Sequence, residues 1–237
     1  MHKGDVEELD FCVTPLGELI LRRRYDQHHE KDAYEVKLND EFLMSSLFTV
    51  GEVALGRIAL ALSDKRSLRV LVGGLGLGYT AVTVLEDPRV VELEVIEYLK
   101  PVIDWHHQKL VPLGKILSGD SRCSLIQGDF FEWPYKNNDT VDIVLLDIDH
   151  SPQHLLNSDN YSFYWSEGLR LLCGRLESGG IFSMWSNDLP DRDFELQLQS
   201  IFDTVKVEVV EFLNPYTNGL ASCSIYTGIT PKFSTCH

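Results

Sequence analysis

The chain has 237 residues, of which 44% are hydrophobic and 24% are charged. This composition predicts one ordinary globular domain with room for a small appendage, and it excludes disordered and fibrous proteins. No apolar run approaches the ~20 residues that a membrane span needs, and residues 1–8 lack the apolar stretch of a signal peptide. We therefore expect a cytoplasmic protein that does not bind membranes.

The formal net charge is −15, from 21 Lys and Arg against 36 Asp and Glu. Such a charge repels nucleic acid, so no nucleic-acid partner is expected. It suits a cationic small molecule as ligand, although solubility alone also accounts for it. The five cysteines are far apart and form no C-x-x-C pair, which is typical of reduced structural thiols.

The N-terminal segment has an extended pattern interrupted by turn residues. Residues 9–14 and 18–22 flank a turn that contains proline and glycine, which predicts a β-hairpin. Residues 34–38 suit a third strand. The charged residues 22–32 are expected to form a solvated loop.

From residue 41 onward, helices and strands alternate. The expected helices are residues 41–62, 79–85, 100–110, 165–176 and 194–202, and the expected strands are 68–72, 90–96, 124–126, 141–146, 180–184, 205–212 and 221–226. The near-continuous apolar strands indicate a parallel sheet that helices cover on both faces, and the last two strands indicate an antiparallel hairpin at one edge.

This order of elements predicts an α/β protein with a Rossmann-like three-layer sandwich of the S-adenosylmethionine-dependent methyltransferase type. A small N-terminal β-hairpin domain precedes the sandwich. We assign residues 1–39 to the small domain and residues 40–237 to the nucleoside-binding catalytic domain.

The sharpest local signal is a glycine-rich turn after the expected strand 68–72. Gly74, Gly76 and Gly78 let a ligand approach the backbone closely, because a Cβ atom would block it. A dinucleotide fold would place a third glycine where Tyr79 stands, so an NAD dehydrogenase is disfavoured. The G-x-G-x-G spacing resembles the loop that binds S-adenosylmethionine, and a tight turn without a ligand is the alternative.

Two acids follow the next strands, at the edge where parallel sheets bind ligands. Glu97 ends the strand over 90–96 and lies 19 residues after Gly78, close to the ~20 expected of an acid that binds a ribose. Asp129 follows the strand over 124–126, where a carboxylate can accept a hydrogen bond from an adenine amino group. The structural alternatives are an exposed strand-end charge and a common Gly-Asp turn.

The stretch richest in reactive groups follows the expected strand 141–146. Asp147 ends that strand, and Asp149 and His150 come next in the loop. Carboxylates in one cleft can bind an ammonium group and take its proton, so we predict Asp147 and Asp149 as catalytic residues. The alternative for Asp147 is a loop-fixing acid. His150 and His154 lie four apart, but no cysteine or third ligand is near, so no metal site is expected.

Together, the hairpin, the glycine loop, the strand-end acid, the Gly-Asp pair and the Asp-x-Asp run resemble the spermidine synthase family of polyamine aminopropyltransferases. The resemblance covers nearly the whole chain, and residues 70–80 align with that family's loop without a gap. It implies transfer of an aminopropyl group from decarboxylated S-adenosylmethionine to putrescine, with no permanently bound cofactor and commonly a homodimer. By this resemblance Glu97 would bind the ribose, Asp129 the adenine, and Asp147 would be the general base.

The sequence departs from the family pattern at three places, all of them positions that recognise an amine group. Leu77 stands where the family loop G-G-G-D-G-G has an acid. Asp149 comes one residue earlier than the second acid of D-S-S-D-P, and Met44, Ser45 and Ser46 occupy the Tyr-His-Glu places of D-E-x-x-Y-H-E. The nucleoside half is therefore kept and the amine half is changed, which favours an S-adenosylmethionine-type ligand over spermidine synthesis.

The leading hypothesis is a transferase that uses S-adenosylmethionine or its decarboxylated form as co-substrate and a small amine as acceptor. A methyltransferase is the alternative, which Leu77 favours, whereas Val72 stands where methyltransferase loops usually carry an acid. A third hypothesis is a non-catalytic nucleoside-binding protein, against which the acids Glu97, Asp129 and Asp147 argue.

Overall fold

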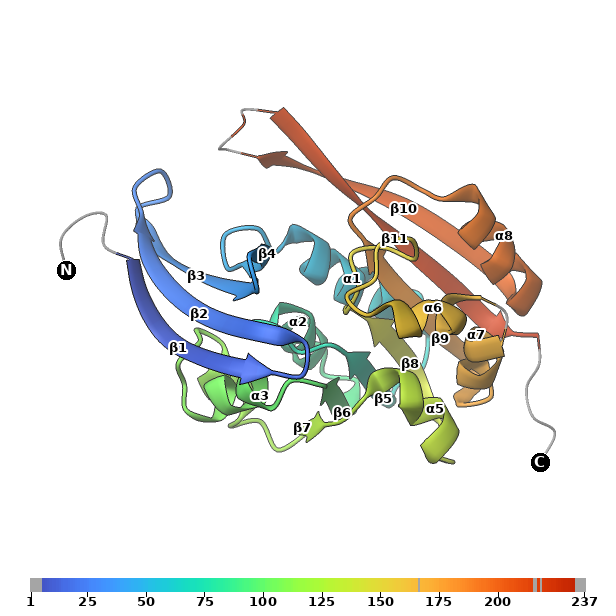
Figure 1. Cartoon of the computed structure of the whole chain (residues 1–237). Helices are drawn as coiled ribbons and strands as arrows, with labels where there is room; N and C mark the ends of the chain where they lie inside the picture. The colour runs from blue at the N-terminus through green and yellow to red at the C-terminus, as the bar shows by residue number, and fades with distance from the viewer. Residues whose placement is uncertain (1–5, 166, 215–216, 218, 233–237) are drawn as a thin grey trace.

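The strands of the protein form two sheets (Figure 1). The computed structural model describes residues 6–165, 167–214, 217 and 219–232. The first sheet is antiparallel, and its strands lie in chain order: β1 (Val6–Thr14), β2 (Gly17–Asp26), β3 (Lys31–Leu38) and β4 (Glu41–Ser45).

The second sheet has seven strands. Their order is β10 (Phe202–Asn214), β11 (Gly219–Pro231), β9 (Leu176–Ser186), β8 (Val141–Leu146), β5 (Leu68–Gly73), β6 (Val90–Glu97) and β7 (Cys123–Gln127). β11 runs antiparallel to both of its neighbours, and the other pairs are parallel. The predicted α/β class, with an antiparallel hairpin at one edge of a parallel sheet, is confirmed.

Helices pack against both faces of this sheet (Figure 1). One hydrophobic cluster holds residues of α1 (Val50–Ala61), α2 (Tyr79–Leu85), α3 (Lys100–His107) and α4 (Gly114–Leu117). A second cluster holds residues of α5 (Trp133–Lys136), α6 (Tyr161–Tyr164), α7 (Glu167–Cys173) and α8 (Arg192–Ile201). Short 3₁₀ turns, η1 (Phe130–Glu132) and η2 (Ser158–Asn160), precede α5 and α6.

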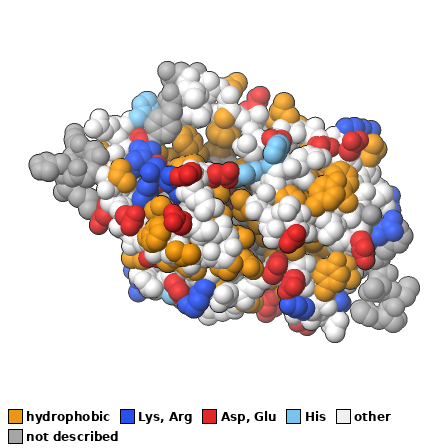
Figure 2. Space-filling model, in the orientation of Figure 1, with side chains coloured by type: hydrophobic (Ala, Val, Ile, Leu, Met, Phe, Trp, Pro, Cys, Tyr) orange, Lys and Arg blue, Asp and Glu red, His pale blue; other side chains and the backbone are white. Residues whose placement is uncertain are grey.

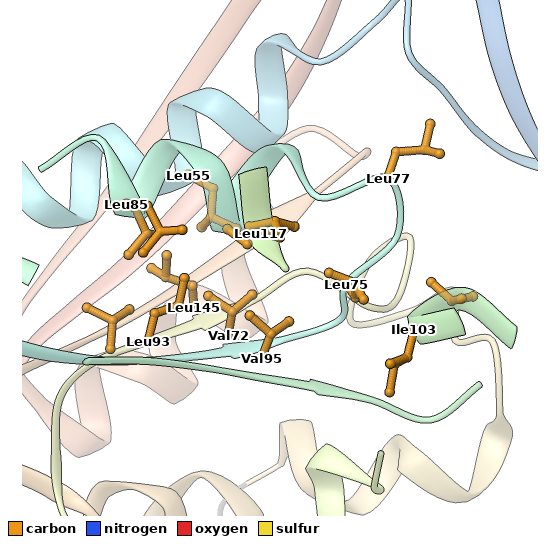
Figure 3. Packing of buried hydrophobic residues seen from close by; sticks show 14 of the residues in the cluster. Leu55, Val72, Leu75, Leu77, Leu85, Leu93, Val95, Ile103, Leu117 and Leu145 are labelled. Atoms are coloured by element: carbon orange, nitrogen blue, oxygen red, sulfur yellow. The ribbon is translucent and has the colours of Figure 1, made fainter. Parts of the chain in front are cut away.

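The central strands explain why both faces are covered. Side chains along a strand alternate between faces, and both faces of β5 are apolar: Val70 and Val72 join the first cluster and Leu71 joins the second. Figure 3 shows part of the first cluster around Val72. All six residues of β8 are buried. Such strands are stable only between two helical layers, which leaves the carboxyl ends of β5, β6 and β8 as the edge available to a ligand.

The first sheet is attached to the core by apolar and polar contacts. Leu19, Leu21 and Val36 are buried in the same cluster as the glycine loop and α3. In addition, the indole nitrogen of Trp105 in α3 donates a hydrogen bond to the carboxylate of Asp10 in β1 at 2.6 Å. The sheet therefore lies against the side of the core that carries the glycine loop.

The single helix predicted over residues 41–62 is wrong. Residues 41–45 form β4, which pairs with β3, and the helix begins only at Val50. The helical spacing of the apolar residues begins only at Leu47, and residues 41–45 pair instead with the edge of β3, which offers an unpaired row of backbone groups.

The solvated loop predicted over residues 22–32 is also wrong in most of its length. β2 continues to Asp26 and β3 begins at Lys31, so only a short turn separates them. The charges are paired across strands: Arg22 and Arg24 each lie 2.7 Å from the buried carboxylate of Glu35. Cross-strand ion pairs make this charged stretch compatible with a sheet.

Several helix and strand boundaries differ from the predicted ones, but the topology is unchanged. The helix expected over 165–176 is shorter, since α7 ends at Cys173 and β9 begins at Leu176. The turn between the last two strands lies partly outside the described residues. The division into domains at residues 39 and 40 stays a prediction, and the first sheet itself continues through β4. No helix within the described ranges is long and apolar enough to cross a membrane.

Candidate functional site

The glycine loop follows β5 and requires backbone conformations that favour glycine. Gly74, Gly76 and Gly78 have φ angles of +93°, +49° and +92°, in the left-handed region that other residues rarely adopt. A Cβ atom on Gly74 would lie 2.1 Å from the backbone oxygen of Asp147. This loop therefore passes directly beside the end of β8, which brings two predicted site segments together.

A first cavity opens at the carboxyl edge of the sheet. It is lined by the glycine loop, by Glu97, Asp129 and Asp147, and by apolar residues of the first sheet such as Leu16 and Leu19. On the face shown in Figure 2, a hollow with hydrophobic side chains separates the first sheet from the core, and acidic and histidine side chains lie at its edge. The structure thus brings together the predicted nucleoside-binding acids and the glycine loop.

Glu97 is positioned by backbone donors. Its carboxylate accepts hydrogen bonds from the N–H groups of Leu75 at 3.0 Å and Leu99 at 2.8 Å. Burial raises the pKa of Glu97, and these backbone hydrogen bonds oppose the rise. The carboxylate also lines the first cavity, where its oxygens can accept hydrogen bonds from the hydroxyls of a ribose.

Asp129 lies in the loop between β7 and η1. One carboxylate oxygen accepts a hydrogen bond from the backbone N–H of Phe131 at 2.8 Å and begins the 3₁₀ turn. Phe130 and Phe131 line the first cavity beside it. A carboxylate with one committed oxygen and two aromatic neighbours provides a hydrogen-bond acceptor and an apolar surface for a purine.

Asp147 lines the first cavity and also a second cavity that adjoins it. The hydroxyl of Thr80 in α2 donates a hydrogen bond to its carboxylate at 2.6 Å. Burial raises the pKa of Asp147 to about 6. A carboxyl group with a pKa near neutrality and a fixed orientation suits a general base.

Glu52 is a residue of the site that sequence reasoning missed. It lies in the first turn of α1 and lines the second cavity with Asp147. Burial, followed by the negative charge of Asp147, raises the pKa of Glu52 to about 8. In the sequence Glu52 falls in the middle of a predicted helix, where an acid usually faces solvent, so only the true start of α1 would have pointed to it.

Asp149 lies apart from both cavities. It is 3% exposed, and its carboxylate accepts hydrogen bonds from the hydroxyl of Tyr164 and the N–H of Leu156, both at 2.7 Å. These contacts fix the loop after β8. We therefore keep Asp147 as the proposed base and assign Asp149 a positioning role.

The two histidines of this loop have different surroundings. His150 lines the second cavity. His154 is exposed and lies 3.1 Å from a carboxylate oxygen of Asp188. Within the described residues no three His, Cys, Asp or Glu side chains form a group that could hold a metal ion.

His106 of α3 packs against the glycine loop. Its Nε2 atom lies 2.9 Å from the carbonyl oxygen of Gly76 and must donate, because a carbonyl can only accept. Its side chain also lies under Gly78, where a Cβ atom would approach Cε1 to 2.9 Å. This histidine had no signal in the sequence, because it lies about thirty positions from its partner.

Gly76→Val is expected to abolish nucleoside binding while the fold survives. The added Cβ atom would lie 2.8 Å from the sulfur of Met44, and valine at a φ of +49° is strained by ~1–2 kcal/mol. Titration calorimetry with methylthioadenosine measures the loss. Gly179→Val is the matched control, because Gly179 has a φ of +72° in open space. Equal binding by the two variants would contradict the role of the loop.

Two solved structures with this fold are spermidine synthases, and a third is a probable spermidine synthase. The enzyme from Thermotoga maritima has 15% identity and a TM-score of 0.73, and the match covers 94% of this chain and 72% of that one. A spermidine synthase in complex with the transition-state analogue AdoDATO has 16% identity and a TM-score of 0.72, over 94% and 73% of the two chains. A probable spermidine synthase from Corynebacterium glutamicum has 16% identity and a TM-score of 0.66, over 98% and 82%.

No protein-family model matches the chain. The three structure matches show that the protein has a spermidine synthase-like fold, which confirms the resemblance predicted from the order of motifs. At this level of identity the likeness concerns the fold, and the chemistry has to be argued from the side chains.

Proposed function

We propose that the protein is a transferase that binds decarboxylated S-adenosylmethionine in the first cavity and passes its aminopropyl group to a small amine in the second. The fold that it shares with spermidine synthases, one of them in complex with AdoDATO, supports a transferase of this kind. A cytoplasmic location and a homodimer stay predictions.

The donor half of the proposal depends on four elements of the first cavity. The glycine loop allows close approach of the nucleoside, and the carboxylate of Glu97 lines the cavity as an acceptor for the ribose hydroxyls. Asp129 has one uncommitted oxygen for the adenine amino group, and Phe130 and Phe131 offer apolar surface for the base. These groups suit the nucleoside that both forms of the donor contain.

Charge favours the decarboxylated form of the donor. The carboxylates that line the two cavities are Glu52, Glu97, Asp129 and Asp147, and none of the described lining residues is Lys or Arg. The carboxylate of S-adenosylmethionine would lie among these acids without a cationic partner. The decarboxylated donor has a sulfonium and an ammonium group, and both are attracted to such a site.

Asp147 is the proposed general base. An acceptor amine arrives as an ammonium ion at neutral pH, and Asp147 takes one of its protons. The freed lone pair attacks the methylene carbon next to the sulfonium. The carbon–nitrogen bond forms as the carbon–sulfur bond breaks, and the bonding pair goes to sulfur. Neutral methylthioadenosine leaves, and the positive charge remains on the new secondary ammonium group.

The position of Asp147 is the single observation that carries this proposal. Its carboxylate lines both cavities, so one ionisable group faces the donor and the acceptor at once. Proximity and orientation of the two substrates supply the rest of the acceleration.

Product analysis tests the proposal. The purified protein is incubated with each donor and a mixture of small primary amines, and the nucleoside product is identified by mass spectrometry. We expect methylthioadenosine from the decarboxylated donor. If neither this product nor adenosylhomocysteine forms, the protein binds nucleosides without catalysis and the proposal fails.

Methyl transfer is the second candidate, and Leu77 is the observation that favours it. This side chain is 3% exposed and lines the second cavity. A leucine does not repel a donor that retains its carboxylate. Adenosylhomocysteine as the product of S-adenosylmethionine would decide for this candidate.

A further inference from the structure

The two carboxylates of the second cavity lie together at one place. The hydroxyl of Thr80 contacts both residues: its oxygen lies 2.6 Å from the carboxylate of Asp147 and 3.4 Å from the backbone oxygen of Glu52. Glu52 and Asp147 are the only acids among the described residues that line this cavity. The other ionisable side chains in its lining are Tyr79 and His150.

Most of the other side chains that line the second cavity are apolar. They include Leu43, Met44, Leu77 and Trp185. Figure 3 shows Leu77 on the glycine loop, at the edge of the hydrophobic cluster. The lining therefore combines a pair of carboxyl groups with an apolar surface.

Trp185 turns its polar atom toward the protein. The indole nitrogen lies so close to Gly51 that a Cβ atom there would approach it to 2.4 Å, and the indole also interacts with the thiol of Cys223. The indole nitrogen thus lies beside Gly51 of α1 and Cys223 of β11. What Trp185 can offer to a ligand is the apolar surface of its ring.

We propose that the acceptor is a primary amine with one cationic nitrogen and an apolar body, and that Glu52 together with Asp147 receives this nitrogen. The proposal rests on the proposed transferase function and names its acceptor class. Glu52 acts beside the base: the nearby ammonium ion favours its ionised form, and the carboxylate then balances the charge of the product while Asp147 takes the proton.

A diamine such as putrescine does not suit this lining. The reacting nitrogen of the acceptor already engages both Glu52 and Asp147. Glu97 and Asp129 belong to the nucleoside in the first cavity. The second ammonium group of a diamine would therefore find no further carboxylate in this lining, and an unpaired buried charge is strongly unfavourable.

The test compares two acceptors of nearly equal size. 1-Pentylamine and putrescine differ in a terminal methyl group against a terminal ammonium group. With the decarboxylated donor, we expect kcat/KM for methylthioadenosine release to be ~100-fold higher with pentylamine, because only putrescine leaves a buried charge unpaired. An equal or higher value with putrescine would overturn the acceptor class and leave the proposed transferase function intact.

Donor binding distinguishes a failure of the proposed transferase function from a failure of the acceptor class alone. If calorimetry detects the donor but neither amine yields methylthioadenosine, the proposed transferase function fails and the acceptor class fails with it. A second measurement does not depend on turnover: in the presence of methylthioadenosine, pentylamine should bind more tightly than putrescine. The reverse order of affinities would contradict the inference.

Variants test the apolar lining and the carboxyl pair of the second cavity separately. Trp185→Ala should lower kcat/KM for pentylamine ~10-fold through lost apolar contact and leave donor affinity unchanged. Glu52→Gln should weaken the binding of both amines. Glu86→Gln is the matched control, because Glu86 is a glutamate at the end of α2 whose side chain is 62% exposed. If Glu52→Gln behaves like this control, Glu52 has no part in acceptor binding.

Discussion

Asp147→Asn should lower turnover by ~10²–10⁴, the range for the loss of a general base, and leave nucleoside affinity nearly unchanged. Asparagine keeps the shape of the side chain and can still accept the hydrogen bond from Thr80, so the end of β8 should stay in place. What is lost is the charge that holds an ammonium ion and the basicity that removes its proton. Single-turnover kinetics and calorimetry on the same preparation measure the two effects separately.

The pH profile adds a second measurement for the same residue. Burial raises the pKa of Asp147 to about 6 and that of Glu52 to about 8, so both groups lose protons as the pH rises through this window. The groups that face this pair are Tyr79, His150 and Cys223. Because the base must be ionised and the acceptor amine must lose a proton, the wild-type rate should rise with pH.

The control for this prediction is Asp188→Asn. Asp188 lies after β9 and outside both cavities, with a side chain that is 46% exposed. It should not alter turnover. If Asp147→Asn retains full turnover on an accepted amine, the base lies elsewhere, and His150 in the second cavity is the next candidate.

Glu97→Ala should weaken nucleoside binding ~10²–10⁴-fold, since two hydrogen bonds to a charged group contribute ~1.5–3 kcal/mol each. The variant also removes the acceptor for the N–H groups of Leu75 and Leu99. A loss of stability is therefore expected alongside the loss of affinity, at ~1–3 kcal/mol for each unsatisfied donor.

Glu97→Gln separates these two effects. Its amide oxygen can still accept from one of the backbone donors, so the loop should be less disturbed, while the charge and one acceptor oxygen are gone. We expect a folded protein by circular dichroism with at least ~10-fold weaker binding of methylthioadenosine, because a charge-assisted hydrogen bond is roughly twice as strong as a neutral one. Unchanged affinity in both variants would show that Glu97 only fixes the loop.

The sequence was most informative where one physical requirement dominates. The strand before Asp147 is apolar at every position except one, and both faces of β5 are apolar, so a doubly covered parallel sheet is nearly the only solution. Gly74, Gly76 and Gly78 predicted a loop whose backbone needs positive φ angles, and the structure has them. Parallel strands then bring the acids at their carboxyl ends to one edge.

The sequence was least informative where contacts with distant residues determine the local conformation. The predicted helix includes residues 41–45, but the open edge of β3 makes them a strand. Glu52 joined the site only because the helix starts later than its pattern suggests, and His106 supports the loop from a distant position in the chain. Asp149 has the right residue type and place in the sequence, yet Tyr164 turns it away from the cavities.

Calorimetry with three ligands tests the central claim most directly. S-adenosylmethionine, its decarboxylated form and methylthioadenosine share the nucleoside and differ in charge. Because both cavities are lined by acids and, among the described residues, by no Lys or Arg, the decarboxylated donor should bind at least ~10-fold more tightly than S-adenosylmethionine, since like charges in close contact repel strongly. Tighter binding of S-adenosylmethionine, or no binding of any of the three, would contradict the account.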